Sequence, residues 1–456
     1  MNQPKQPYTF PDSFTWGVAT SSFQIEGATF EDGRGASIWD TFCAKQGTIA
    51  DASNGEIACD HYHRWSEDLD LIKSLEVNAY RFSIAWPRIL PKGFGQVESK
   101  GLDFYERLVD GLLERNIDPW VTLYHWDLPQ ALQDQGGWVS RDVVEHFVDY
   151  TRIVCERLGD RVAGWITHNE PWCASVLGYL NGEHAPGIKD NYAHLASSHH
   201  LLLSHGKAVP VIREIVGDRP VGITLNLVPS VPASSSEADA EANARFDGFF
   251  NRWYLDPLAG RGYPQDMIER YKAENYIDDW SFIQDQDLKE ISQPIDFLGI
   301  NYYSRGIIRS DRVDESENLP VEVIANSNPT DMGWEVYPQG IYDLLTRVHQ
   351  DYDFKSIYIT ENGAAYATGP DEHGVVHDQL RESYLHDHLI ACHHARQAGV
   401  PLDGYFAWSL MDNFEWAFGY EKRFGIVYVD YETQQRIPKQ SALWYRNVAK
   451  TGEISC

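Results

Sequence analysis

Residues 165–171 read Trp-Ile-Thr-His-Asn-Glu-Pro, an apolar, strand-forming run that ends abruptly in Asn169 and Glu170. A second stretch, residues 357–363, reads Ile-Tyr-Ile-Thr-Glu-Asn-Gly, and its Glu361 also follows a β-branched and aromatic run. Taken singly, a glutamate after a strand is most often a solvated loop residue. If both strands lie parallel in one barrel, however, the two carboxylates meet at the same end and can face a single bond. Paired carboxylates of this kind are what the cleavage of a glycosidic bond needs.

Strands and helices alternate along the whole chain. Hydrophobic periodicity predicts strands over residues 14–20, 79–86, 118–126, 162–170, 221–228, 295–303, 356–361 and 402–410. It predicts helices over residues 60–74, 100–116, 142–158, 192–216, 237–254, 338–351, 381–398 and 440–450. This alternation is typical of an α/β protein with a closed (β/α)8 barrel, the TIM barrel. A doubly wound open sheet is the competing architecture, but no glycine-rich phosphate-binding fingerprint follows the first strand.

The chain shows no internal boundary. A length of 456 residues fits one barrel when the loops after its strands are long. No repeat, low-complexity tract or linker divides the sequence, so we expect residues 1–456 to form a single catalytic domain. Residues 311–331 and 364–377 read as long surface loops that shape the entrance to the site.

Charge limits the possible partners. Acidic residues number 67 against 38 basic ones, which gives a formal net charge of −29. This excess argues against a nucleic-acid surface or an anionic membrane and favours a neutral or cationic small molecule over a phosphorylated one. The first ten residues are polar and no apolar run reaches membrane-spanning length, so we expect a cytoplasmic protein. The oligomeric state stays open.

Cysteines and histidines lack the spacing of a metal site. The cysteines are scattered, so free thiols are expected at Cys43, Cys59, Cys155, Cys173, Cys392 and Cys456. Three histidine pairs have no acidic or cysteine partner at ligand spacing, namely His61 with His63, His199 with His200, and His393 with His394. We therefore expect no metal, and the paired-carboxylate chemistry needs no cofactor.

Several motifs in order resemble those of family 1 glycoside hydrolases, the retaining β-glucosidases and β-galactosidases. The resemblance runs from Tyr8 to Val448. It rests on Phe-Gln-Ile-Glu-Gly at 23–27, Tyr-Arg-Phe-Ser at 80–83, Leu-Tyr-His-Trp-Asp at 123–127, Thr-His-Asn-Glu-Pro at 167–171, Asn-Tyr-Tyr-Ser at 301–304, Ile-Thr-Glu-Asn-Gly at 359–363 and Trp-Ser-Leu-Met-Asp-Asn-Phe-Glu-Trp at 408–416.

The resemblance implies a role for each matching residue. Glu361 matches the nucleophile and Glu170 the general acid/base of a double displacement through a covalent glycosyl-enzyme. The positions beside the nucleophile are Arg81, Tyr303 and Asn301. Asn169 matches the residue that binds the sugar 2-hydroxyl. The other matching sugar-binding positions are Gln24, His125, Trp126, Glu415, Trp416 and Phe424, with Trp408 as the platform under the ring.

The same segments bear on whether the sugar is phosphorylated and on which sugar it is. Phosphoglycosidases of the family carry a Ser, Lys, Tyr arrangement where this chain has Glu415, Lys422 and Phe424. A carboxylate at residue 415 would repel a phosphate, so a free sugar is favoured. The alternatives are a 6-phospho-β-glycosidase and a non-catalytic sugar-binding relative, but both catalytic glutamates are present. Glucose, fucose and galactose are not separated, because Gln24 and Glu415 can bond either orientation of the 4-hydroxyl.

The leaving group is expected to meet an apolar entrance. The residues placed on this aglycone side are Trp172, Leu177 and Trp334. A narrow apolar entrance would favour aryl or alkyl leaving groups and short oligosaccharides over long chains.

Overall fold

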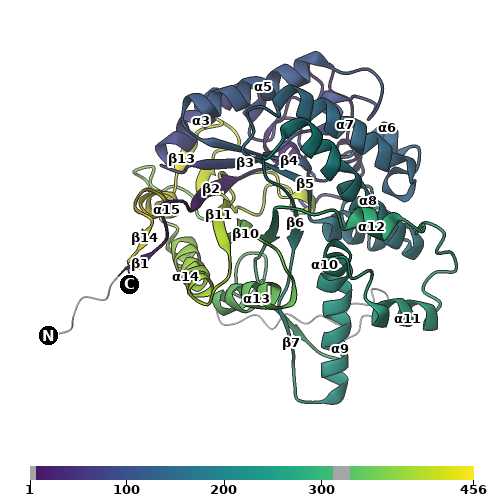
Figure 1. Cartoon of the computed structure of the whole chain (residues 1–456). Helices are drawn as coiled ribbons and strands as arrows, with labels where there is room; N and C mark the ends of the chain where they lie inside the picture. The colour runs from purple at the N-terminus through teal and green to yellow at the C-terminus, as the bar shows by residue number, and fades with distance from the viewer. Residues whose placement is uncertain (1–6, 312–328, 456) are drawn as a thin grey trace.

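The computed structural model describes residues 7–311 and 329–455. Its centre is a closed barrel of eight parallel strands (Figure 1), which confirms the predicted TIM barrel. Around the barrel the strands follow the order β10-β11-β2-β3-β4-β5-β6-β8. They are β2 (Thr15–Ala19), β3 (Ala79–Ser83), β4 (Asp118–Tyr124), β5 (Gly164–Asn169), β6 (Val221–Asn226), β8 (Phe297–Asn301), β10 (Ile357–Asn362) and β11 (Leu402–Trp408).

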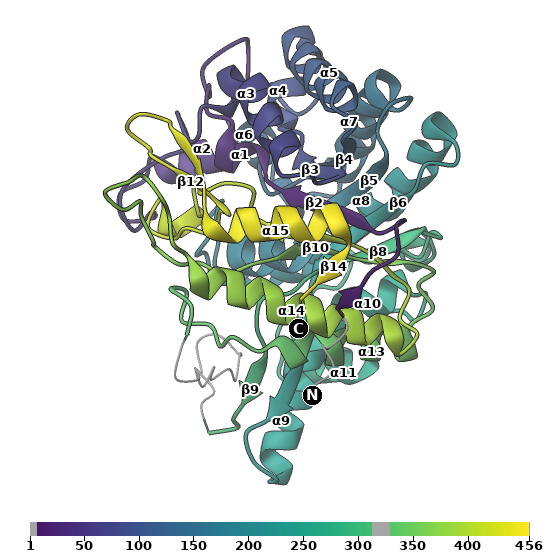
Figure 2. The same ribbon diagram turned by 90° about the vertical axis from the view of Figure 1, so that its left-hand side faces the viewer.

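An outer layer of helices covers the barrel, and Figure 2 shows two of them, α14 and α15, crossing one side of it. The predicted helices correspond to α3 (His61–Ser74), α5 (Ser99–Glu114), α7 (Asp142–Leu158), α8 (Asn191–Val216), α9 (Glu237–Asp247), α13 (Pro338–Asp351), α14 (Gln379–Gln397) and α15 (Gln440–Thr451). The helix predicted over residues 237–254 differs in one respect. A π-helical segment (Gly248–Arg252) follows α9 and leads into α10 (Trp253–Leu258).

Several barrel strands end earlier than the sequence predicts. Two aromatic residues that continue the apolar pattern lie beyond the strands: Trp86 begins α4 (Trp86–Ile89), and Trp126 follows the end of β4 in a left-handed conformation with φ of 77°. Both side chains are buried. Buried apolar residues therefore continue past the end of a strand, so the apolar pattern does not show which residue is the last to pair with the neighbouring strand.

Short elements that the periodicity does not indicate decorate the barrel. The helices among them are α1 (Ser22–Ile25), α2 (Ile38–Cys43), α6 (Gln130–Gln133), α11 (Gln265–Ala273), α12 (Asp287–Ile291), a π-helix (Cys173–Leu180) and two 3-10 turns (Gly137–Val139 and Trp416–Phe418). Three small sheets pair β7 (Ser230–Pro232) with β9 (Gly306–Ile308), β12 (Val427–Val429) with β13 (Arg436–Pro438), and β1 (Tyr8–Thr9) with β14 (Glu453–Ile454). Residues 364–377 form the predicted loop, whereas most of residues 311–331 lies outside the described residues.

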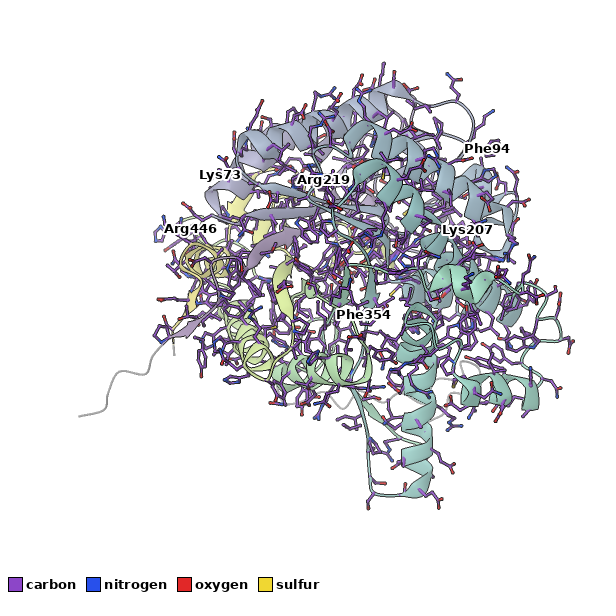
Figure 3. All side chains as sticks on the ribbon, in the orientation of Figure 1. Lys73, Phe94, Lys207, Arg219, Phe354 and Arg446 are labelled. Carbon is purple, nitrogen blue, oxygen red and sulfur yellow. The ribbon has the colours of Figure 1, made fainter. Side chains whose placement is uncertain are left out.

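Aromatic rings fill the barrel interior. The indole of Trp120 packs against Phe297, Tyr358 and Phe406, with ring centroids 5.4, 4.8 and 5.6 Å away. A Cβ at Gly17 would lie 2.2 Å from the Phe406 ring, so only glycine fits there. A second, larger core lies between the strands and the helices, where the side chains are dense (Figure 3). The packed interior leaves the carboxyl ends of the strands as the place for a site.

One histidine of each of two pairs hydrogen-bonds an acidic side chain. Nδ1 of His61 lies 2.8 Å from Asp68, and Nε2 of His199 lies 2.8 Å from Asp287. Within the described ranges no group of three or more His, Cys, Asp or Glu side chains could hold a metal ion. Five of the cysteines are free thiols, and Cys456 lies outside the described residues. Among the helices of the described chain, none has the length and apolar character to cross a membrane.

Candidate active site

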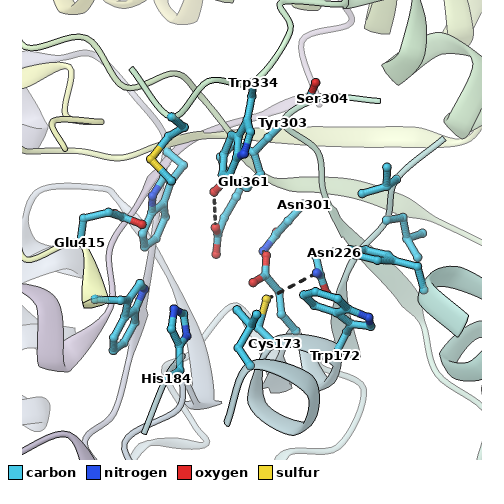
Figure 4. A pocket seen from close by; sticks show the side chains of 18 of the residues that line it. Trp172, Cys173, His184, Asn226, Asn301, Tyr303, Ser304, Trp334, Glu361 and Glu415 are labelled. Carbon is cyan, nitrogen blue, oxygen red and sulfur yellow. Dashed lines mark hydrogen bonds between the residues drawn. The ribbon is translucent and has the colours of Figure 1, made fainter. Parts of the chain in front are cut away.

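Two buried glutamates share one cavity of about 480 Å³ at the carboxyl end of the barrel (Figure 4). Glu361 is part of β10, and Glu170 directly follows β5. The backbone of Glu170 is left-handed, with φ of 49°, and its N–H donates to the Thr224 carbonyl at 2.9 Å. This turn at the end of β5 is held by the neighbouring strand β6. The barrel thus brings the two carboxyl groups into one cavity, as the sequence predicts.

Arg81 and Tyr303 hold the carboxylate of Glu361. Nη1 of Arg81 lies 2.7 Å from Oε1 of Glu361 and also donates to the Thr360 carbonyl. The Tyr303 hydroxyl donates to Oε2 at 2.6 Å. Both oxygens of Glu361 therefore have a donor, and one of the two donors is a buried cation that compensates the charge.

Asn301 touches the other carboxyl group as well. Its Nδ2 donates to Oε1 of Glu170 at 2.6 Å, and Asn301 is the register partner of Glu361 where β8 pairs with β10. The Thr360 hydroxyl donates to Oδ1 of Asn301 at 2.7 Å, which turns the amide nitrogen toward the carboxyl groups. The sequence placed Asn301 beside Glu361 only, and it gave no signal for Thr360.

The surroundings of the two glutamates act differently on their protonation. Burial and the negative charge of Glu361 raise the pKa of Glu170 to about 8. Burial also raises the pKa of Glu361, but the charge of Arg81 and the hydrogen bond from Tyr303 oppose that rise. Because a cation faces only one of the pair, Glu361 is the group that holds a negative charge and Glu170 the group that holds a proton.

His125 and Asn169 form a pair beside the glutamates. Oδ1 of Asn169 accepts from Nη2 of Arg81 at 2.7 Å, so its Nδ2 faces Nε2 of His125 at 3.1 Å. Burial holds the pKa of His125 well below its usual value, so the ring is neutral. With Nε2 accepting, Nδ1 carries the proton, and this buried atom has no protein partner in the described part of the chain. The His125 side chain lines the cavity.

The remaining sugar-side residues gather around Glu415. Gln24 is fully buried, and its Nε2 donates to Oδ1 of Asn413 at 3.0 Å and to the Phe414 carbonyl at 2.9 Å. Burial and the charges of the two other glutamates raise the pKa of Glu415 to about 8. The predicted residues that line the cavity here are Glu415, His125, Trp126, Trp408, Trp416 and Phe424.

Three predicted residues stand behind this lining rather than in it. Gln24, Arg81 and Asn169 are buried, and their polar atoms bind the side chains that face the cavity. Asn413, which holds Gln24, was not singled out from the sequence.

Comparison with known proteins agrees with this geometry. The profile of glycosyl hydrolase family 1 matches residues 6–454. The chain belongs to glycosyl hydrolase family 1. Beta-glucosidase A of Thermotoga maritima is 50% identical over 451 residues, which cover 98% of each chain. The bifunctional beta-D-glucosidase/beta-D-fucosidase of Bifidobacterium breve is 45% identical over 457 residues, covering 96% of this chain and 97% of its own.

The fold of this family 1 glycoside hydrolase matches solved structures equally well. The structure of the family 1 β-glucosidase from Thermotoga maritima superposes with a TM-score of 0.94 at 48% identity and covers 99% of this chain and 100% of its own. The overall fold is therefore shared with a solved family 1 structure.

The outer cavity of this family 1 chain is largely apolar. The predicted residues Trp172, Leu177 and Trp334 all line it, and Figure 4 shows Trp172 across the cavity from Glu415. Trp172 packs on Phe250 with ring centroids 4.1 Å apart, and Trp334 packs on Tyr303 at 5.4 Å. Lining residues that the sequence did not single out are Cys173, Glu183, His184, Phe246, Phe250 and Phe418.

Lys422 is the basic residue that would bind the phosphate in the 6-phospho-β-glycosidase alternative, but it makes other contacts here. Its Nζ donates to the Asp331 carbonyl at 2.8 Å and lies over the ring of Phe418. Lys422 does not line the cavity, whereas the carboxyl group of Glu415 does. The geometry disfavours a phosphorylated sugar.

Proposed function

We propose that this glycoside hydrolase is a β-glucosidase that releases terminal non-reducing β-D-glucosyl residues with retention of configuration, using Glu361 as nucleophile and Glu170 as general acid/base. One observation carries the assignment: two buried carboxyl groups line one cavity, and only Glu361 is hydrogen-bonded to a cation, Arg81. The names of the Thermotoga and Bifidobacterium relatives support glucose as the sugar.

In the first step Glu361 attacks the anomeric carbon while Glu170 protonates the departing oxygen. The C–O bond to the leaving group breaks, an ester forms with Glu361, and the proton leaves Glu170. A pKa of about 8 keeps Glu170 protonated at neutral pH. The family resemblance assigns Asn169, which adjoins His125 beside the glutamates, to the sugar 2-hydroxyl, a contact that strengthens as positive charge develops at the anomeric carbon.

In the second step Glu170 acts as a base. Once Glu361 is an ester it carries no charge, so one cause of the raised pKa of Glu170 disappears and the carboxylate can remove a proton from water. That water attacks the anomeric carbon, and the bond to Glu361 breaks with its electron pair returning to the carboxylate. A sugar hydroxyl in place of water would give transglycosylation.

The sugar range is proposed to include β-fucosides and β-galactosides. Glu415, which lines the cavity in front of Gln24, can bond either orientation of the 4-hydroxyl, and the name of the Bifidobacterium relative includes fucosidase activity. A 6-phospho-β-glycosidase is disfavoured by the placement of Glu415 and Lys422. A binding-only role is disfavoured because both carboxyl groups are present in one cavity.

The experiment that tests the proposal compares kcat/KM on four p-nitrophenyl β-glycosides: glucoside, fucoside, galactoside and 6-phosphoglucoside. Glu361→Ala, which lacks the nucleophile, is the blank, and we expect a loss of roughly 10⁴-fold or more. Turnover of the neutral sugars that disappears in the blank supports the proposal. Preference for the phosphorylated sugar would overturn the interpretation of Glu415, and no turnover at all would favour the binding-only alternative.

We also propose that residues 1–456 form one catalytic domain. The barrel strands are spread from Thr15 to Trp408, and β1 pairs with β14 across nearly the whole length of the chain. A cytoplasmic location stays a prediction from the sequence. The proposed substrates are small β-glycosides such as cellobiose.

A further inference from the structure

Two loop segments that carry the sugar-side residues lie against each other. Residues 409–416 contain Glu415 and Trp416, and residues 423–429 contain Phe424. Backbone hydrogen bonds join them: Ser409 N–H donates to the Phe424 carbonyl at 3.2 Å, and Asp412 N–H donates to the Val427 carbonyl at 2.9 Å. The part of the sugar side that holds Glu415, Trp416 and Phe424 is therefore built from two segments whose relative position matters.

The carboxylate of Asp412 lies at their junction and is fully buried. It accepts from Nζ of Lys439 at 2.7 Å, from Nη1 of Arg423 at 2.8 Å and from the backbone N–H of Gly425 at 3.0 Å. The two segments come so close here that a Cβ at Gly425 would lie 2.0 Å from the Asp412 nitrogen. One carboxylate thus ties together the two segments and residue 439, which directly precedes the outer helix α15.

Each partner of Asp412 is next to a residue of the sugar side. Arg423 and Gly425 flank Phe424, which lines the cavity. On the other segment, Asn413 follows Asp412 and accepts the hydrogen bond from Gln24. Asp412 itself is not part of the cavity lining. Any effect it has on a sugar must therefore pass through its neighbours.

Stability alone is a weak explanation for this cluster. A buried ion pair costs desolvation, and apolar groups of the same volume often stabilise a fold equally well. Lys439 is fully buried, and burial together with the charge of Arg381 lowers its pKa to about 7, so its ammonium depends on Asp412. A directional, charge-assisted contact does fix the position of what it joins, which apolar packing does less well.

We propose that Asp412, with Lys439 and Arg423 as its partners, is a positioning residue that holds Glu415 and Phe424 in register and so sets the selectivity for the 4- and 6-hydroxyl side of the sugar. The inference rests on the proposed β-glycosidase function. It concerns one side of the ring only, since the 2-hydroxyl side belongs to Asn169, which Arg81 and Asn301 hold independently.

The test uses two selectivity ratios measured on the full chain. One is kcat/KM for p-nitrophenyl β-glucoside over the β-xyloside, which lacks the hydroxymethyl group at C5. The other is the β-glucoside over its 2-deoxy analogue. Asp412→Asn removes the charge at nearly constant volume. The matched control is Asp287→Asn, because Asp287 is also buried and paired with a cation, Arg141, but neither residue is next to one that lines the cavity.

We expect Asp412→Asn to reduce the glucoside-to-xyloside preference roughly tenfold, the effect of losing one charge-assisted hydrogen bond. The glucoside-to-2-deoxyglucoside ratio should stay within about twofold, and Asp287→Asn should change neither ratio even if it lowers the melting temperature. If Asp412→Asn fails to fold, the double variant D412N/K439M leaves neither member of the pair charged and gives the same readout.

Two outcomes would overturn the inference. In one, a folded variant keeps the glucoside-to-xyloside preference. In the other, both ratios fall together, which means a general loosening of the site. A wild-type chain that hydrolyses no glucoside would instead refute the proposed function, and this result is seen before any variant is compared.

Discussion

The proton on Glu170 is controlled by a few neighbouring atoms. Burial and the charge of Glu361 favour the protonated form, while the Nδ2 of Asn301 at 2.6 Å favours the ionised one. The first effect depends on the state of Glu361, so the same residue can serve as acid before the ester forms and as base afterwards.

A pH profile follows from this arrangement. With an alkyl β-glucoside, whose leaving group needs protonation, kcat/KM should fall as the pH rises through about 8, because Glu170 then loses its proton. With the dinitrophenyl glucoside, whose leaving group departs without help, this alkaline limb should be much flatter. Glu170→Gln should lose roughly 10²–10⁴-fold on the alkyl substrate and far less on the activated one. Equal losses on both substrates would contradict the assignment of Glu170 as the acid.

Tyr303 offers a test of the other glutamate. Its hydroxyl donates to Glu361 at 2.6 Å and so favours the ionised form. In Tyr303→Phe the pKa of Glu361 should rise, and the acid limb of kcat/KM should move to higher pH, because the nucleophile must be ionised to attack. The measurement is the pH profile of both proteins on one aryl glucoside. Tyr337→Phe, outside the cavity lining, is the control, and an acid limb that stays in place would argue against this role.

Some residues of the site could be predicted from the sequence and others could not. Glu170 and Glu361 were predictable because an apolar run ending in a carboxylate marks a strand end. Thr360 and Asn413 were not, because their roles consist of hydrogen bonds to Asn301 and Gln24, partners that are distant in the sequence. Nothing in a hydroxyl or amide at one position indicates such a partner.

At the scale of elements, the barrel strands and long helices were predictable because each repeats a period of two or 3.6 residues over many positions. The short elements around the cavity were not. The π-helix Cys173–Leu180 and the paired strands β7 and β9 are too short for a periodic pattern, and contacts with other loops decide them. Part of the lining that the sequence missed, such as Phe250 in the π-helical segment Gly248–Arg252 and Phe418 in the 3-10 turn Trp416–Phe418, belongs to such irregular parts.

The described residues 329–337, directly before α13, contribute Trp334 to the outer cavity, where the indole packs on Tyr303 and Phe424. Trp334→Ala should lower kcat/KM for aryl β-glucosides roughly tenfold relative to cellobiose, because a planar aglycone loses an aromatic face. Trp444→Ala on the outer helix α15 controls for the loss of a tryptophan. If the ranking of aryl glucosides against cellobiose is unchanged, the proposed aglycone contact is wrong.

At the scale of the whole molecule, the two ends of the described chain pair with each other. Tyr8 and Thr9 of β1 face Ile454 and Glu453 of β14, and Phe10 N–H donates to the Gly452 carbonyl at 2.8 Å. This small sheet lies just before β2, at the amino end of the barrel and away from the catalytic cavity.

Ile454 is fully buried in this sheet, so its contribution to stability can be separated from activity. Ile454→Ala should lower the free energy of unfolding by about 2–4 kcal/mol, the usual cost of removing a buried Ile side chain. Its kcat/KM should stay within about twofold of wild type, since the change is remote from the cavity. Val231→Ala, at an exposed position of β7, should change the stability by less than about 0.5 kcal/mol. A loss of activity in folded Ile454→Ala would show that the amino end of the barrel influences the site.

The pairing of β1 with β14 also decides how the molecule can be attached to other things. Because the described chain begins and ends in this one small sheet, and none of its residues lines the cavity, a carrier protein, an affinity handle or a solid support joined there should leave the substrate entrance open. The two ends are also near enough for a short linker to close the chain into a ring, and new ends could then be opened in an exposed loop elsewhere.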